Sequence, residues 1–244
     1  MRNRDSIDIE QSTRRFHSQR AEDFIASIDN PLLQISRLET NISPDSLVTI
    51  NHSYREAIKS TDNDNAWRTL FELAISESLI KQYTNAVNNY TQAIALNPSN
   101  PFLYLNRAAT QAEMIDFISS IDNGYQRLSI ESDPARRLQN AGTRTYDYSE
   151  AISDLNKAIK LHSGFAYAYY NRANLYALSG MLPEAADDYT KAIELNPYFA
   201  EAYYNRGLLQ IYMKDTRKGC LDISKAGELG IAEAYDVLKS YSDR

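Results

Sequence analysis

Three histidines and one cysteine are the residues of this sequence that most often do catalytic or metal-binding chemistry. His17, His52 and His162 are far apart, and none stands with cysteines or carboxylates at the spacing of a metal site. The chain has no glycine-rich phosphate loop, no GxSxG turn and no HExxH motif. Cys220 follows a glycine in a predicted helix, a setting typical of a small core residue rather than a nucleophile. We therefore expect no enzymatic activity, no cofactor and no metal.

The overall composition favours a protein partner. The 244 residues include 43% hydrophobic residues, enough for a substantial core, and the formal net charge is −6. An acidic chain is poorly suited to nucleic acid or to an anionic membrane surface. Residues 1–20 contain no apolar signal segment, and no run of 18 apolar residues is present. The default expectation is a cytoplasmic protein, with the periplasm as the alternative if the chain is a piece of an exported protein.

A repeated segment indicates which elements position the side chains. Ala-Tyr-Ala-Tyr-Tyr-Asn-Arg-Ala at 166–173 recurs as Ala-Glu-Ala-Tyr-Tyr-Asn-Arg-Gly at 200–207, an offset of 34 residues. A helix–turn–helix unit that stacks on copies of itself repeats with this period. Two more copies begin at Trp67 and Pro101, so the sequence predicts four stacked helix pairs.

Alignment of the four copies shows three positions that hold only alanine or glycine. Positions eight, twenty and twenty-seven need small residues because paired helices approach closely there. These residues are Ala74, Ala108, Ala173 and Gly207; Ala86, Ala151, Ala185 and Gly219; and Ala93, Ala158, Ala192 and Ala226. We expect larger side chains to fill the spaces between helices, namely Tyr90, Leu155, Tyr189 and Ile223, and Leu96, Leu161, Leu195 and Leu229.

This pattern of small and large residues resembles the tetratricopeptide repeat (TPR) family over about residues 67–242. The chain is also similar to the C-terminal part of long bacterial proteins of that family. The resemblance implies an all-α fold, a right-handed superhelical solenoid of antiparallel helix pairs. It implies a repeat array at 64–244, and the sequence before it is expected to form a helical leader at 1–63 that matches the repeat poorly. The repeats are expected at 67–100, 101–165, 166–199 and 200–231, followed by a capping helix at 231–242.

The second repeat contains an insertion at about 117–147. Its second helix is expected to begin near Tyr148, about 31 residues later than the period requires. Within the insertion, residues 125–130 either form a short strand or extend the preceding helix. Four arginines make the insertion locally basic, so it is either a second site for a partner or a loop without one. They are Arg127, Arg136, Arg137 and Arg144.

Two charged positions recur in the last three copies. Position seven holds Arg107, Arg172 and Arg206, and position twenty-three holds Asp154, Asp188 and Asp222. We hypothesise that they form ion pairs between the helices of one repeat or between neighbouring repeats. The alternatives are independent surface charges, or arginines that contact a ligand. The first copy has Leu73 and Asn89 at these positions.

In the TPR family, the first helices line a concave groove that commonly binds a peptide or helix. The resemblance places eight groove residues here: Asn106, Tyr167, Tyr170, Asn171, Asn174, Glu201, Tyr204 and Asn205. Some members clamp a partner's terminal carboxylate, but Phe71, Tyr170 and Tyr204 stand where lysines are needed, so we predict no such clamp. The expected function is a non-catalytic scaffold or adaptor. The alternative is a homo-oligomer or assembly component that packs through its N-terminal end, near Trp67 and Phe71.

Overall fold

The computed structural model describes residues 44–58, 65–128 and 146–242. The expectations for residues 1–43 and for most of the insertion lie outside the described residues. The described parts contain ten helices and no strand. The helices are α4 (Pro44–Ile58), α5 (Ala66–Leu79), α6 (Tyr83–Leu96), α7 (Pro101–Leu128), α9 (Ser149–Leu161), α10 (Ala166–Leu178), α11 (Leu182–Leu195), α12 (Ala200–Tyr212), α13 (Thr216–Glu228) and α14 (Glu233–Ser242).

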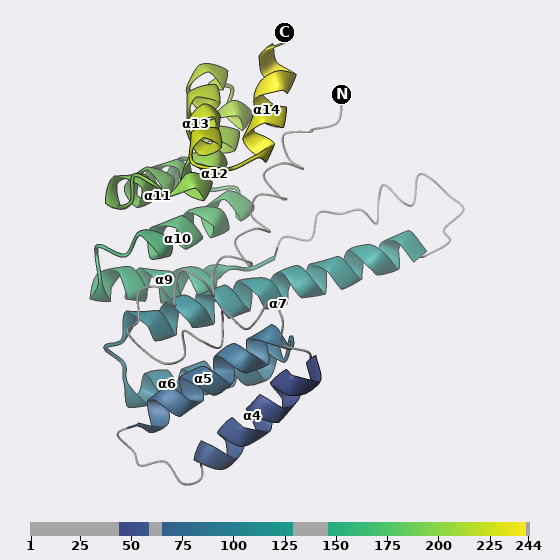
Figure 1. The fold of residues 1–244 in the computed structure, drawn as a ribbon, viewed down its shortest axis with the longest axis vertical. Helices are drawn as coiled ribbons and strands as arrows, with labels where there is room; N and C mark the ends of the chain where they lie inside the picture. Colours follow the sequence, from purple (N-terminus) through teal and green to yellow (C-terminus); the bar gives the residue numbers. More distant parts are fainter. Residues whose placement is uncertain (1–43, 59–64, 129–145, 243–244) are drawn as a thin grey trace.

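The helices pair as the sequence period predicts, and the fold is an all-α solenoid (Figure 1). The pairs are α5–α6, α7–α9, α10–α11 and α12–α13, and each pair packs on the next. Helix α4 packs on α5 at one end of the stack, and α14 packs on α13 at the other. No helix among the described residues is long and apolar enough to cross a membrane.

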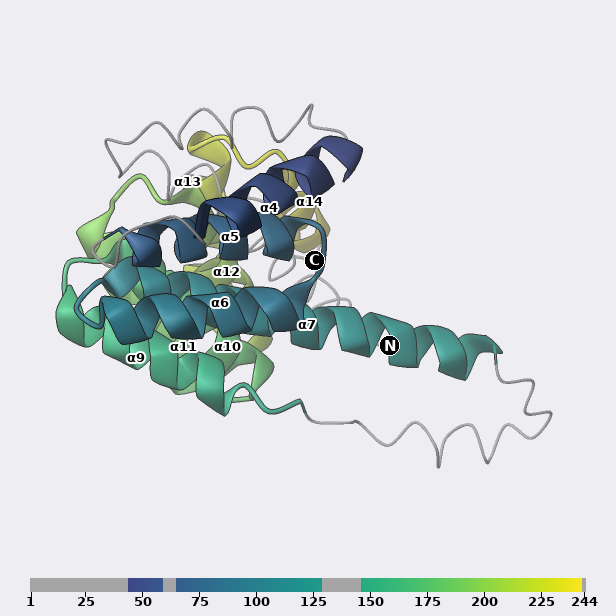
Figure 2. The ribbon, with the colours of Figure 1, turned by 90° about the horizontal axis from the view of Figure 1, so that it is seen from below.

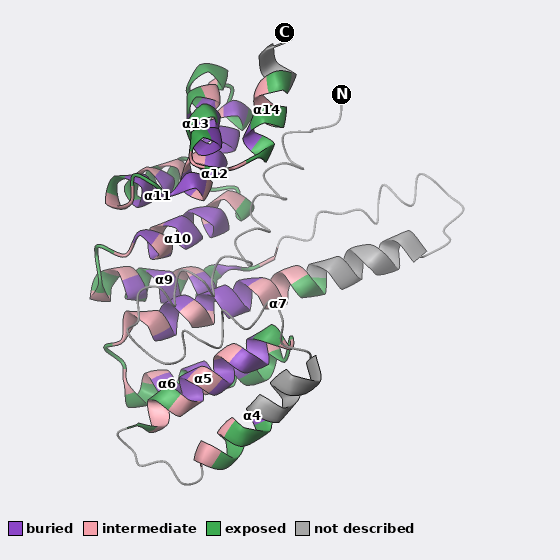
Figure 3. Cartoon of the chain, in the orientation of Figure 1, coloured by how far each residue is buried: buried purple, intermediate pink, exposed green. Residues whose placement is uncertain are grey.

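The small-residue positions lie at the helix contacts, as predicted. Ala74, Ala86, Ala173 and Ala185 are all 0% exposed, so the paired helices meet there without room for a larger group. Among the large residues, Tyr90, Leu155, Tyr189 and Ile223 are at most 1% exposed. Figure 3 shows buried residues along the sides of the helices that face one another in the stack.

The second set of large residues lies at the edge of the core, so the prediction is confirmed only in part: Leu161 and Leu195 pack against the main core cluster, and the prediction was wrong for Leu96. Leu96 is 48% exposed, and Leu161, Leu195 and Leu229 are only half-buried. These leucines belong to the last turn of the second helix or, for Leu229, directly follow it.

Helix α7 has 28 residues, twice the length of the other first helices (Figure 2). The other first helices end in a turn whose position fifteen has positive φ, at Lys81, Gly180 and Lys214. Ile115 occupies this position in the second repeat, and a β-branched residue strongly disfavours positive φ. The helix therefore continues through this point to Leu128, so residues 125–128 extend the helix rather than forming a strand.

The positive φ at position fifteen leads to a stability prediction. Lys214 has a φ of 72°, its side chain is exposed, and its N–H donates to the carbonyl oxygen of Ile211. Removing the Cβ strain should outweigh the entropy that glycine adds to the unfolded chain, so Lys214→Gly should stabilise the fold by about 0.5 kcal/mol. Denaturant unfolding measures this. Gly180→Ala, at the same position of the third repeat with φ of 76°, should do the opposite. A destabilised Lys214→Gly would show that the lysine side chain stabilises the turn.

Candidate functional site

The hypothesised ion pairs are present in all three repeats that have the charged residues. In each pair the arginine Nε and Nη2 donate to the two carboxylate oxygens of the aspartate. The distances are 2.7 and 2.7 Å for Arg107–Asp154, 2.6 and 2.7 Å for Arg172–Asp188, and 2.7 and 2.9 Å for Arg206–Asp222. This two-point geometry is the strongest form of a charged hydrogen bond. It joins the first helix of a repeat to the second helix of the same repeat.

Each of these arginines also reaches the preceding repeat, which the sequence reasoning missed. The Nη1 of Arg107 donates to Thr91 at 2.9 Å, that of Arg172 to Asn156 at 2.5 Å, and that of Arg206 to Thr190 at 3.0 Å. One guanidinium therefore links three helices. We use the word rung for such a unit, in which one central charged side chain hydrogen-bonds to a helix on each side of its own helix. A signal existed in the sequence, because position twenty-five reads Thr91, Asn156 and Thr190 in successive copies.

The rungs are shielded from water at their charged centre. The side chains of Arg172 and Asp188 are 17% and 10% exposed. The hydrogen bonds to Asp188 raise the pKa of the Arg172 guanidinium above its usual value. The rings of Tyr169 and Tyr176 lie over this guanidinium, with centroids 5.5 and 5.6 Å from its carbon. The hydrogen bonds to Asp188 and the two rings together fix the position of the Arg172 guanidinium.

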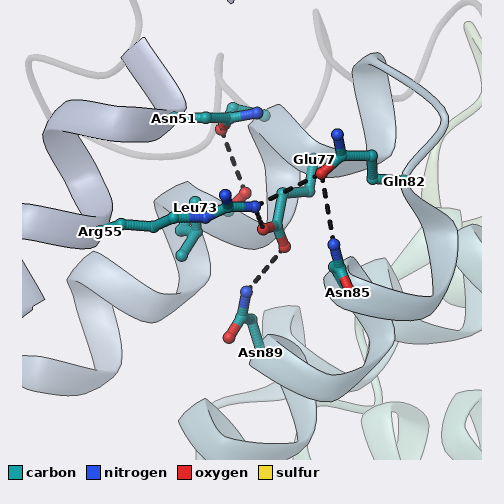
Figure 4. Close-up of polar contacts among 8 residues, drawn as sticks. Asn51, Arg55, Leu73, Glu77, Gln82, Asn85 and Asn89 are labelled. Atoms are coloured by element: carbon teal, nitrogen blue, oxygen red, sulfur yellow. Dashed lines mark hydrogen bonds and ion pairs between the residues drawn. The ribbon is translucent and has the colours of Figure 1, made fainter. Parts of the chain in front are cut away.

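The first repeat contains a rung with the opposite charge at its centre (Figure 4). Glu77 of α5 is 1% exposed, and its carboxylate accepts from Asn89 of α6 at 2.7 Å and from Arg55 of α4 at 2.8 Å. Asn51 of α4 accepts a second hydrogen bond across the same contact, from Ser76. Helix α4 thus contacts α5 in the way that the second helix of a preceding repeat contacts the next first helix.

A buried polar network joins the third and fourth repeats. The Asn174 Oδ1 accepts from the Tyr189 hydroxyl at 2.5 Å and from the Asn205 Nδ2 at 2.9 Å, and the same Nδ2 lies 3.1 Å from the Tyr170 hydroxyl. Burial, and secondarily Tyr170, raises the pKa of Tyr189 well above its usual value. The Nδ2 of Asn174 is buried and donates to no described residue.

Comparison with known proteins agrees with this periodic architecture. Family models described as "Tetratricopeptide repeat" match residues 166–199 and 188–228, and one described as "TPR repeat" matches 80–114. The chain is a tetratricopeptide repeat protein. The matched segments include the second helix of the first repeat, the first part of α7, and both helices of the third and fourth repeats.

Solved structures show the same TPR fold. The crystal structure of MamA is 18% identical, with 82% of this chain and 96% of that chain covered and a TM-score of 0.58. MamA 41-end from Desulfovibrio magneticus RS-1 is 17% identical, with 79% and 93% covered and a TM-score of 0.57. A thermophilic TPR protein from Thermus thermophilus is 17% identical, with 92% and 97% covered and a TM-score of 0.54. At these identities the likeness concerns the fold alone.

The eight predicted groove residues of this TPR array differ in exposure. Tyr170, Asn171, Asn174, Tyr204 and Asn205 are between 1% and 8% exposed. Tyr170 packs its ring on Phe199 and Tyr189, with centroids 4.7 and 6.0 Å apart. Asn106, Tyr167 and Glu201 are half-buried. The structure thus joins Tyr170, Asn174 and Asn205 in one network, and leaves Tyr167 and Glu201 at its margin as the more accessible side chains.

Cys220 is half-buried against the cluster formed by α12, α13 and α14. Burial raises the pKa of its thiol, which disfavours the reactive thiolate. In the described part of the TPR array, no group of three or more histidine, cysteine, aspartate or glutamate residues is arranged to hold a metal ion.

Proposed function

We propose that this TPR array is a scaffold that binds an extended peptide or a helix of a partner protein along its first helices. The family and the fold support a protein-interaction module. The observation that carries the proposal is the unpaired Nδ2 of Asn174. An unpaired buried donor costs about 1–3 kcal/mol, and a carbonyl oxygen of a bound peptide would offset that cost by accepting its hydrogen bond. Asn174 is 1% exposed, so access requires a side-chain movement.

The rungs support this function by making the binding surface rigid. A surface that is already ordered loses little conformational entropy when a ligand binds. Arg172 joins α10 to α11 and Arg206 joins α12 to α13, so the helices that carry the polar network are held together without a partner. The acidic Glu201 and the aromatic Tyr167 then flank the network and suit a peptide of mixed polarity.

The test compares two variants of the full chain as bait. Tyr167→Ser/Glu201→Lys changes the accessible side chains beside the network, and Glu194→Lys makes the same charge change on the exposed side of α11. Affinity capture with quantitative mass spectrometry should give one partner for the wild type and for Glu194→Lys. Recovery of that partner should fall about tenfold with the double variant, a loss typical of removing an interface contact. Equal recovery by all three baits would reject the groove as the binding site.

The second candidate function is self-association through the N-terminal end. Trp67 packs against the core cluster of the first repeat, together with Ile58 of α4, and Phe71 is 5% exposed. The fold thus covers much of the apolar surface that suggested this function from the sequence. Light scattering of the purified chain decides between the two, because a concentration-dependent dimer with no captured partner would favour self-association.

A further inference from the structure

A polar hollow lies between the first and second repeats, away from the groove residues. It has a volume of about 500 Å³ and is lined by residues of α6, α7 and α9. Its lining includes Arg107 and Gln111 on α7, Thr91 on α6, and Glu150 and Ser153 on α9. At 3.6 residues per turn, Arg107 and Gln111 are about 100° and 140° around α7 from the groove residue Asn106, and the lining of the hollow includes none of the eight groove residues. The hollow is therefore a separate site.

Comparison with the next repeat shows what the hollow lacks. Gln111 occupies position eleven, where the third repeat has Tyr176. The ring of Tyr176 lies over the Arg172 guanidinium at 5.6 Å, whereas no ring of the described chain lies over Arg107 within cation–π distance. Ser153 likewise stands where the third repeat has the larger Asp187. In the third repeat, the ring of Tyr176 thus occupies the position that corresponds to this hollow.

The hydrogen-bonding groups of the hollow point to the same kind of occupant. Gln111 is 8% exposed, its Nε2 donates to Glu150 at 3.2 Å, and its buried Oε1 accepts from no described residue. The Nε, Nη1 and Nη2 of Arg107 each donate one hydrogen bond to Asp154 or Thr91, so two of the five N–H groups and the flat faces of the guanidinium remain to contact a ligand. The site therefore suits a ring that also bears a hydrogen-bond donor.

We propose that this hollow binds the side chain of a tyrosine presented by a partner peptide. The ring stacks on the Arg107 guanidinium, as Tyr176 does on Arg172, and the phenol hydroxyl donates to the Gln111 Oε1. A carboxylate in this place would meet Glu150 and Asp154, whereas a lysine would meet Arg107 as well as these carboxylates and has no ring to cover the guanidinium. The interaction does not depend on the groove, so either site can fail its test while the other passes.

The test is a titration of the full chain with N-acetyl-tyrosinamide, followed by NMR at the Arg107 side chain. The phenylalanine and lysine amides serve as comparison probes. We expect saturable shifts with the tyrosine amide and binding about tenfold weaker with the phenylalanine amide, which lacks the donor hydroxyl. Equal binding of the tyrosine and phenylalanine amides, tighter binding of the lysine amide, or no shift at Arg107 would each overturn the proposal.

Two variants connect the binding to Gln111. Gln111→Tyr supplies the ring from within the chain and should abolish the tyrosine shifts while the protein stays folded. Gln210→Tyr makes the same change at position eleven of the fourth repeat and should leave them unaltered. If Gln111→Tyr does not fold, Gln111→Leu keeps the volume and removes the acceptor, so the tyrosine and phenylalanine amides should then bind alike. Unchanged binding to Gln111→Tyr, or an unchanged preference for tyrosine in Gln111→Leu, would reject the site.

Discussion

Asp188→Ala is expected to destabilise the array by about 3 kcal/mol, because it leaves a mostly buried guanidinium without its carboxylate. Arg172 is 17% exposed and donates two hydrogen bonds to Asp188, so little water can replace the lost partner. Its third contact, to Asn156, joins the second repeat to the third. The loss should therefore weaken the packing within the third repeat and also the contact between repeats. Denaturant unfolding of the full chain measures the effect.

A double-mutant cycle separates the ion pair from other effects of the substitution. Arg172→Ala should cost less than Asp188→Ala, because removal of the long arginine side chain opens space through which water reaches the remaining carboxylate. The double variant should be more stable than the sum of the two single changes by at least about 1 kcal/mol. The surface pair Lys191–Glu194, with side chains 46% and 58% exposed, should show a coupling of about 0–0.5 kcal/mol. A coupling for Arg172–Asp188 no larger than for the surface pair would contradict the structural role of the rung.

Periodic sequence features predicted the fold and the ion pairs well. The small residues at positions eight, twenty and twenty-seven are buried, and the arginine and aspartate columns meet in space. Positions of the repeat alignment that hold the same residue type are informative because each repeat makes the same contact. A residue that occurs by chance in one repeat does not recur at that position in the others. The acceptors at position twenty-five are equally periodic, but threonine and asparagine side chains often hydrogen-bond to their own backbone or to water, so their recurrence alone does not predict a contact between repeats.

Features that occur once could not be predicted in this way. The rung of the first repeat, which has Glu77 at its centre, depends on Arg55. Arg55 lies in a helix without a matching repeat pattern, so no alignment of copies relates it to Glu77. Helix α7 passes the point where the other first helices turn, and only the comparison of Ile115 with Gly180 explains this. Helical periodicity gave the face on which the groove residues lie, but not how deeply Tyr170 and Asn205 would be covered by the neighbouring repeat.

The close approach of α12 and α13 leads to the second large prediction. The fourth repeat has glycine at both positions eight and twenty, where the third repeat has alanine. A Cβ at Gly219 would lie 2.6 Å from the carbonyl oxygen of Gly207 and 2.5 Å from a side-chain carbon of Ile211. Real side chains do not approach so closely, and a backbone carbonyl within a helix cannot turn aside. The two helices must therefore move apart if Gly219 gains a methyl group.

Gly219→Ala should accordingly destabilise the protein by about 2 kcal/mol, the cost of overpacking a tight helix contact. This destabilisation is opposite to the usual effect of replacing a glycine within a helix, since alanine is the better helix former by about 1 kcal/mol. Gly227→Ala in the same helix is the matched control, because its Cβ would meet its nearest neighbour, the Ala234 Cβ, at 3.4 Å, an ordinary contact. That variant should gain about 0.5–1 kcal/mol. Thermal and denaturant unfolding of the two variants should therefore shift in opposite directions. A stabilised Gly219→Ala would mean that α12 and α13 can separate as far as their counterparts α10 and α11 without loss of packing.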